Sequence, residues 1–268
     1  GATLAGVFRA IEVHGVAPTT RVPADDFAEI GKALDVGAVA IVVPKGNSVE
    51  KNAAMRGFGA DVIVHGADFQ ESREHAAVVA DERGYELVSP FNPDLVAGVA
   101  TYARELFDVS GELDVVYVPV GMGSGINGLI AVRDLLGLST EIVGVISDAA
   151  PATALSFDAR QPVNTSTAHT FVDGVACREP DPGALAAIYD GAARIVTVSD
   201  DAVADAMRLA YRTMHHLPEP AGAIALAGLL AERERVQGQR VAFVLSGANM
   251  DSSMVATVMS GSTPRPPT

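Results

Sequence analysis

The sequence predicts an α/β fold in which mostly parallel strands are covered by helices. Its strand candidates are short runs rich in Val and Ile, without the alternation typical of half-exposed strands. Helical segments of about 10–15 residues separate most of these runs. A glycine-rich turn, Gly121–Gly125, follows one strand candidate and precedes a helix candidate. Because ligands of such folds bind at the carboxyl ends of strands, this turn and the loop at 246–249 are candidate ligand-binding positions.

Regular elements alternate from residue 27 onward. Residues 1–27 are irregular because Gly15, Pro18 and Pro23 interrupt them. Asp26 is a suitable N-cap for a helix over 27–34, and Ser48 for the helix at 49–58. The elements expected up to residue 107 are strands at 38–43, 61–65 and 85–88, and helices at 27–34, 49–58, 68–83 and 93–107.

The same alternation continues in the second half of the chain. The elements expected there are strands at 114–120, 141–147, 194–198 and 240–245, and helices from the glycine turn to 136 and at 150–160, 181–192, 200–214 and 219–236. Residues 161–173 read as irregular, and the Gly, Ser and Pro of the last nine residues predict a frayed end. We expect a first domain at 1–110, a second at 111–259 and a flexible tail at 260–268.

Composition narrows the classes of function. A hydrophobic content of 49% indicates a folded protein, and a net charge of −14 argues against binding the phosphates of nucleic acids. No run reaches the ~18 apolar residues that span a bilayer. The single cysteine, Cys177, cannot form an internal disulfide, and no Cys/His cluster has the spacing of a metal site. We expect a cytoplasmic protein that binds neither nucleic acid nor membrane.

The turn at Gly121–Gly125 is the strongest local signal. Glycine at 121, 123 and 125 lets the backbone approach a ligand without an intervening Cβ. The turn opens a helix, so its free N–H groups and the positive end of the helix dipole favour an anion, most often a phosphate. A tight strand-to-helix turn without a ligand is the alternative, since short glycine patterns recur by chance.

Six blocks of sequence resemble, in order, the fold-type-II pyridoxal phosphate (PLP) enzymes, and in particular the threonine/serine dehydratase-like group. The blocks are 41–56, 90–94, 118–129, 173–176, 219–223 and 246–251. The resemblance implies a two-domain, tryptophan-synthase-β-like fold with parallel sheets covered by helices. It also implies a lyase that removes water and ammonia from a hydroxy-amino acid.

The resemblance implies roles for residues of these blocks. The turn residues Gly121, Met122, Gly123, Ser124 and Gly125 would wrap the phosphate of PLP. Gly174 would lie close to the cofactor, Glu219 near its ring, and Ser246 would hydrogen-bond the pyridine nitrogen. The alternatives are a strand-end turn for Ser246 and a charge at a helix start for Glu219.

The chain departs from the family where the Schiff-base lysine should stand. The closest match to that motif is Ala5-Gly6-Val7-Phe8-Arg9, with Arg9 at the lysine position. A guanidinium stays protonated and cannot form a Schiff base. The chain has three lysines, Lys32, Lys45 and Lys51, and none of them is expected where the aldehyde should lie.

A second departure affects the small domain. The family's substrate-carboxylate loop corresponds to 20–25, where Val22 and Pro23 replace glycine and asparagine. Proline removes an N–H donor, and Asp25 would repel a carboxylate. The N-terminal segment is also shorter than in the family, so we expect a reduced small domain.

Three functions are compatible with these observations. The first is a homologue that has lost Schiff-base catalysis and acts as a partner chain or as a PLP- or phosphate-binding protein. The alternatives are a working PLP-dependent lyase and an enzyme with PLP-independent chemistry in the same cleft. We expect PLP bound non-covalently at most, or no cofactor, and a small substrate or phosphate ligand between the domains. A homo-oligomer or a complex with a related chain is expected as well.

Overall fold

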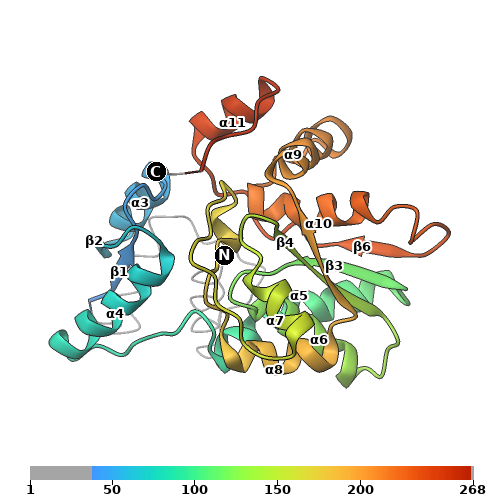
Figure 1. Cartoon of the computed structure of the whole chain (residues 1–268), viewed down its shortest axis with the longest axis horizontal. Helices are drawn as coiled ribbons and strands as arrows, with labels where there is room; N and C mark the ends of the chain where they lie inside the picture. The colour runs from blue at the N-terminus through green and yellow to red at the C-terminus, as the bar shows by residue number, and fades with distance from the viewer. Residues whose placement is uncertain (1–37, 267–268) are drawn as a thin grey trace.

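The computed structural model describes residues 38–266, and its strands form two parallel sheets (Figure 1). The smaller sheet pairs β1 (Ala40–Val43) with β2 (Asp61–Val64). The larger sheet has the order β5-β4-β3-β6. Its strands are β3 (Val115–Pro119), β4 (Glu141–Ser147), β5 (Arg194–Val198) and β6 (Val241–Phe243). The predicted α/β class with parallel sheets is confirmed.

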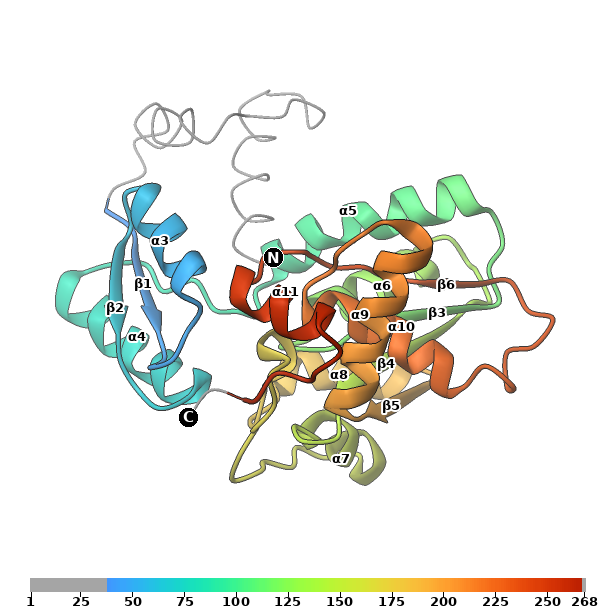
Figure 2. The same cartoon turned by 90° about the horizontal axis from the view of Figure 1, so that it is seen from above.

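Two helices accompany the smaller sheet, and each begins at a capping side chain. In α3 (Val49–Gly57), Ser48 Oγ accepts the N–H of Lys51 at 3.0 Å. In α4 (Phe69–Arg83), Asp68 accepts the N–H of Glu71 at 2.9 Å. The cap at Ser48 was predicted from its side-chain type, whereas Asp68 was expected as the first residue of its helix and instead caps it. Figure 2 shows this group of elements beside the larger sheet.

Helices cover both faces of the larger sheet. Val115 and Tyr117 of β3 pack in one apolar cluster with α9 and α10, and Val116 and Val118 pack in a second with α5 and α6. A parallel sheet buried on both faces has apolar residues at consecutive positions, which explains the unbroken Val/Ile runs. The remaining elements are α5 (Pro93–Ser110), α6 (Ser124–Leu135), α7 (Ala152–Ala159), the 3-10 helix η1 (Asp173–Val175), α8 (Pro182–Gly191), α9 (Asp200–Met214), α10 (Pro220–Ala231) and α11 (Ser252–Met259).

Three elements differ from the prediction. The strand expected at 85–88 is wrong, because this segment pairs with no described strand and leaves Leu87 and Val88 at 50% and 63% exposure. Strand β6 is shorter than expected, and α11 was not anticipated. The helix predicted at 27–34 lies outside the described residues.

The elements between residues 93 and 266 share the larger sheet's core. Helix α5 buries Ala103 and Phe107 in the cluster that holds Val116. Near the chain end, Arg208 of α9 donates a hydrogen bond to the carbonyl of Ser262 at 3.3 Å. The domain bounds at 1–110, 111–259 and 260–268 stay predictions. None of the described helices is both long and apolar enough to cross a lipid bilayer.

Candidate functional site

The glycine-rich turn joins the carboxyl end of β3 to α6 and is closely packed on two sides. Gly123 is the N-cap of α6 with φ +97, a conformation that L side chains rarely adopt. A Cβ at Gly123 would lie 2.8 Å from Cβ of Ala184, and one at Gly121 would lie 2.4 Å from the carbonyl oxygen of Gly174. Both positions therefore require glycine for physical reasons, and the turn meets the 3-10 helix η1 through Gly174.

The helix η1 in turn contacts the start of α10. A Cβ at Gly174 would lie 2.6 Å from Cβ of Ala221. Glu219, the N-cap residue of α10, donates its N–H to the carbonyl of Gly247 at 3.0 Å. A Cβ at Gly247 would lie 2.5 Å from Oε1 of Glu219. This chain of contacts brings together segments of four predicted blocks, which hold Gly121, Gly174, Glu219 and Ser246.

The other predicted site residues have defined places too. Met122 has its Sδ 3.5 Å from the Sγ of buried Cys177. Ser124 is the first residue of α6, and the carbonyl of Gly125 accepts the hydroxyl of Tyr102 at 3.1 Å. Ser246 follows β6 and is exposed. Arg9, the predicted substitute for the family lysine, lies outside the described residues.

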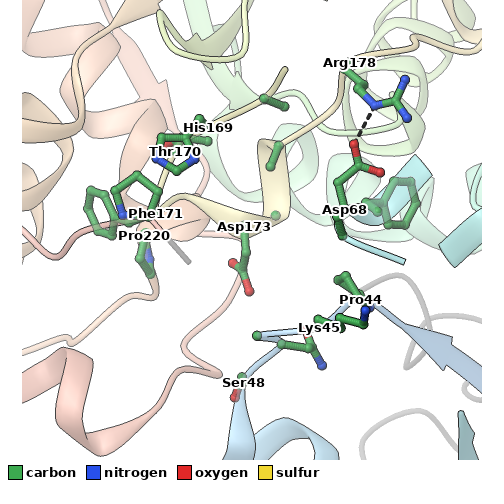
Figure 3. A pocket seen from close by; sticks show the side chains of 18 of the residues that line it. Pro44, Lys45, Ser48, Asp68, His169, Thr170, Phe171, Asp173, Arg178 and Pro220 are labelled. Carbon is green, nitrogen blue, oxygen red and sulfur yellow. Dashed lines mark hydrogen bonds and ion pairs between the residues drawn. The ribbon is translucent and has the colours of Figure 1, made fainter. Parts of the chain in front are cut away.

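A cavity of about 450 Å³ opens between the smaller sheet's group and the larger sheet (Figure 3). Residues of both groups line it, including Lys45, Ser48, Asp68, Asp173, Gly174 and Arg178. Figure 3 shows the carboxylate of Asp173 pointing toward the segment that carries Lys45 and Ser48. The turn at 121–125 does not line this cavity and lies next to it, in contact with Gly174.

Lys51 lines this cavity and forms two ion pairs. Its Nζ lies 2.7 Å from Oδ2 of Asp173 and 3.5 Å from Oε2 of Glu219. Burial lowers the pKa of Lys51, but the two carboxylates outweigh it, so the pKa is raised. Burial raises the pKa of Glu219, and the charge of Lys51 opposes that shift in part. Sequence reasoning missed this cluster, because its members are far apart in the chain.

A second ion pair closes another side of the cavity. Arg178 donates from Nε to Oδ2 of Asp68 at 2.5 Å (Figure 3). It also donates from a terminal nitrogen to Oε1 of Glu179 at 2.8 Å. Asp68 also caps α4, so this pair links the start of α4 to the segment after η1. Lys45, by contrast, is exposed at the end of β1.

These features define the class of protein: a parallel α/β protein with a close-packed glycine-rich turn after a central strand and a charged cleft beside it. The sequence pattern of the family described as "Pyridoxal-phosphate dependent enzyme" matches residues 26–247. The chain belongs to this family, and its fold and sequence are similar to those of the fold-type-II, threonine/serine dehydratase-like enzymes.

Named relatives support this assignment. The chain is 33% identical over 214 residues to the L-threonine dehydratase biosynthetic IlvA of Salmonella typhimurium, across 79% of this chain and 42% of that protein. It is 32% identical over 231 residues to the L-threo-3-hydroxyaspartate ammonia-lyase of Saccharomyces cerevisiae, across 86% of this chain and 71% of that one. The chain thus spans less than half of the Salmonella protein.

A solved structure shares the architecture. The processed form of threonine deaminase isoform 2 from Solanum lycopersicum superposes with a TM-score of 0.81 at 26% identity. The superposition covers 97% of this chain and 78% of that one. The predicted fold-type-II architecture is therefore confirmed.

The residues of the site fit the cofactor that the family implies. The turn keeps glycine where a Cβ would block the backbone at Gly121 and Gly123. The first turn of α6 has free N–H donors of the kind that bind a phosphate. Ser246 carries a hydroxyl that can meet a ring nitrogen, and it stands next to Gly247, which contacts Glu219. PLP binding is implied by the family, and these residues are the ones that would hold it.

Proposed function

We propose that this chain binds PLP through the turn at Gly121–Gly125 and lacks the covalent attachment that its family makes at the position of Arg9. It would then act as a partner of an active lyase or as a PLP- or phosphate-binding protein. The observation that carries the proposal is the retention of the close-packed glycine turn together with arginine at the lysine position. Arginine cannot bond covalently to the aldehyde under ordinary conditions.

The chain's own groups support binding and charge balance in the cleft. The turn and α6 offer backbone donors to a phosphate. The ammonium of Lys51 forms ion pairs with Asp173 and Glu219. Its positive charge reduces the repulsion that these two carboxylates would exert on an anionic ligand in the cleft. When bound in a lyase, PLP supplies an electron sink for the carbanion formed at the substrate.

A titration with PLP tests this proposal. We expect the purified full chain to bind PLP by equilibrium dialysis and to release it on exhaustive dialysis against phosphate. Borohydride treatment should leave no cofactor fixed at residue 9 in the wild type. In the variant Arg9→Lys a fixed adduct at residue 9 is expected if the N-terminal region reaches the cleft. Absence of PLP binding by the wild-type chain would contradict the proposal.

A working lyase is the second candidate, and the relatives favour it. The yeast protein is named an ammonia-lyase, and this chain covers most of its length. The test is release of a 2-keto acid and ammonia from L-serine, L-threonine and L-threo-3-hydroxyaspartate in the presence of PLP. Turnover of any of these above the rate with PLP alone would establish this function in place of the first.

We also propose that the chain forms a homo-oligomer or a complex with a related chain. Apolar side chains are exposed on several elements, among them Val49, Phe58, Val64 and Val109. An interface with another chain would bury such apolar side chains. Light scattering coupled to gel filtration should give a mass above that of one chain, and a monomer at micromolar concentration would contradict the homo-oligomer.

A further inference from the structure

We propose that the buried side-chain amide of Asn127 holds the turn at Gly121–Gly125 in the conformation that binds a phosphate, which makes Asn127 a positioning residue for this ligand. The inference rests on the proposed function, because it requires the phosphate of PLP at the turn. It gives a role to a side chain of α6 to which the sequence resemblance assigns none.

The turn passes into α6 without a capping side chain. Gly123 is the N-cap residue of α6 and has no side chain that could accept a hydrogen bond. By contrast, a side-chain oxygen accepts an N–H at the start of α3, α4 and α5. The first N–H groups of α6 have no acceptor within the helix either. Other contacts must therefore fix the conformation of the turn.

Asn127 supplies two of these contacts. Its Nδ2 donates to the carbonyl oxygen of Gly123 at 2.8 Å and to that of Ala184, on α8, at 3.2 Å. The residue is only 5% exposed, so both hydrogen bonds are shielded from water. Because both acceptors are carbonyl oxygens, the amide must present its nitrogen to them. Asn127 thereby ties the peptide of Gly123 to α8.

The planar peptide bond extends the effect of this contact to a hydrogen-bond donor. The carbonyl of Gly123 and the N–H of Ser124 belong to one trans peptide unit and point in opposite directions. Holding the carbonyl toward Asn127 therefore turns the N–H of Ser124 away from Asn127. Ser124 is the first residue of α6, so this N–H is one of the free donors at the helix start. The amide of Asn127 thus sets the direction of a donor that an anion at the turn can use.

Tyr102 of α5 supports the turn in the same way. Its hydroxyl donates to the carbonyl of Gly125 at 3.1 Å, and this carbonyl shares its peptide unit with the N–H of Ile126. Burial raises the pKa of Tyr102 above the ordinary value of 10.0, so the hydroxyl stays protonated and remains a donor at neutral pH. Two carbonyl oxygens of the turn are thus bound by buried side chains, which leaves the N–H groups of the same peptide units for a ligand.

Two substitutions of Asn127 that differ by one oxygen atom test the inference. In Asn127→Ser the hydroxyl can donate to the carbonyl four residues earlier, which is that of Gly123, whereas Asn127→Ala has no donor. In fluorescence titrations of the full chain, Asn127→Ala should bind PLP at least about fivefold more weakly than the wild type, the effect of one lost hydrogen bond. Asn127→Ser should stay within about twofold of the wild type. Asn127→Thr and Asn127→Val, whose side chains have nearly equal volumes, repeat the comparison with less empty space at the site.

Two controls separate positioning of the turn from a general loss of stability. Pyridoxal lacks the phosphate, so the wild type and Asn127→Ala should bind it with the same affinity. Ser156→Ala removes a buried hydrogen bond of the same kind outside the turn, from Oγ to the carbonyl of Ala152 at 2.7 Å. It should lower the urea midpoint of unfolding and leave the affinity for PLP unchanged.

The outcomes separate this inference from the proposed function. If the wild type binds PLP and the variants with and without a hydroxyl at residue 127 bind it with equal affinity, the positioning role is refuted while the binding function stands. A fall in the affinity for pyridoxal that matches the fall for PLP would refute the positioning role as well. If the wild type binds no PLP, the proposed function fails and the inference fails with it.

Discussion

At the scale of single residues, the site is defined by the close packing around Gly121 and by the ion pairs of Lys51. Gly121 leaves room for the carbonyl of Gly174, and Lys51 joins Asp173 to Glu219 across the cavity. The first contact brings the phosphate turn against the cleft wall, and the second sets the charge inside it. Substitutions at these positions should therefore affect ligand binding more than folding.

Gly121→Ala should weaken PLP binding by at least about tenfold, equivalent to 1.4 kcal/mol. The added Cβ would lie 2.4 Å from the backbone oxygen of Gly174, so the turn must shift away from its ligand-binding position. Gly57→Ala is the control, because a Cβ there meets no atom within 4 Å. Equal PLP affinity in the two variants, measured by fluorescence titration, would place the phosphate elsewhere.

Glu232→Gln should lower stability by about 1 kcal/mol at neutral pH. The carboxylate accepts Tyr117 Oη at 2.7 Å and Arg194 Nε at 2.9 Å. Burial raises the pKa of Glu232, but these hydrogen bonds outweigh it and leave the pKa below the ordinary 4.5. For Tyr117, burial and donation to Glu232 raise the pKa to about 12.

The sign of the pH dependence follows from that lowered pKa. The pKa of Glu232 is lower in the folded chain than in the unfolded chain, where it is about 4.5. The stabilisation that Glu232 gives to the folded state is therefore present above about pH 4.5 and is lost as the pH falls through the lower, folded-state pKa. Urea unfolding at pH 7 and pH 3.5 should show a difference between wild type and Glu232→Gln that shrinks at the lower pH. Exposed Glu234→Gln should show little difference at either pH.

At the scale of elements, α3 and α11 cap each other across the molecule. Asp251 accepts the N–H of Glu50 at 3.0 Å and that of Val49 at 3.2 Å, and it also accepts the hydroxyl of Ser48. In return, Glu50 accepts the N–H and the hydroxyl of Ser252 at 2.8 and 2.6 Å. Each helix start thus has at least one of its free N–H donors bound by a carboxylate at the start of the other helix. Since α3 also carries Lys51, this pairing orients the lysine toward the cleft.

Asp251→Ala should lower the free energy of unfolding by about 1 kcal/mol, the usual value for a lost N-terminal cap. Denaturant unfolding measures this effect. Asp190→Ala, at an exposed position of α8, is the control. Equal free energies of unfolding in the two variants would show that the Asp251 cap does not stabilise the fold.

At the scale of the whole molecule, the two sheets are joined in sequence by the segment between α4 and α5. Residues 85–92 contain no helix or strand, and Leu87 and Val88 are among the more exposed apolar residues. All buried residues of the larger sheet's two apolar clusters come after this segment in the chain. The molecule should therefore open first at this connection.

Limited digestion with chymotrypsin tests this expectation. Within the part of the chain that the structure describes, the first cut should fall after Tyr85 or Leu87, because unpaired exposed backbone is cut before packed elements. The fragment from residue 88 onward should resist further digestion. Initial cleavage in the irregular stretch at 161–173, followed by loss of the larger fragment, would contradict it. Mass spectrometry of the products identifies the cut.

The sequence by itself determined the α/β class, nearly all strands of the larger sheet, the glycine turn and its family. These features depend on local patterns: Val/Ile runs between helices, a capping residue such as Ser48, and glycine where a Cβ cannot fit. The strand expected at 85–88 failed because a strand requires a partner, and partner strands are not encoded locally.

Only the tertiary structure decided which polar and charged residues of distant segments contact each other. Lys51 is separated by 122 residues from Asp173, and Ser48 by 203 from Asp251, so neither contact has a local signature. Their pairing follows from how the smaller sheet's group packs against the larger sheet, which places α3 beside η1, α10 and α11. The family resemblance located the phosphate turn, whereas only the packing revealed an amine inside the cleft.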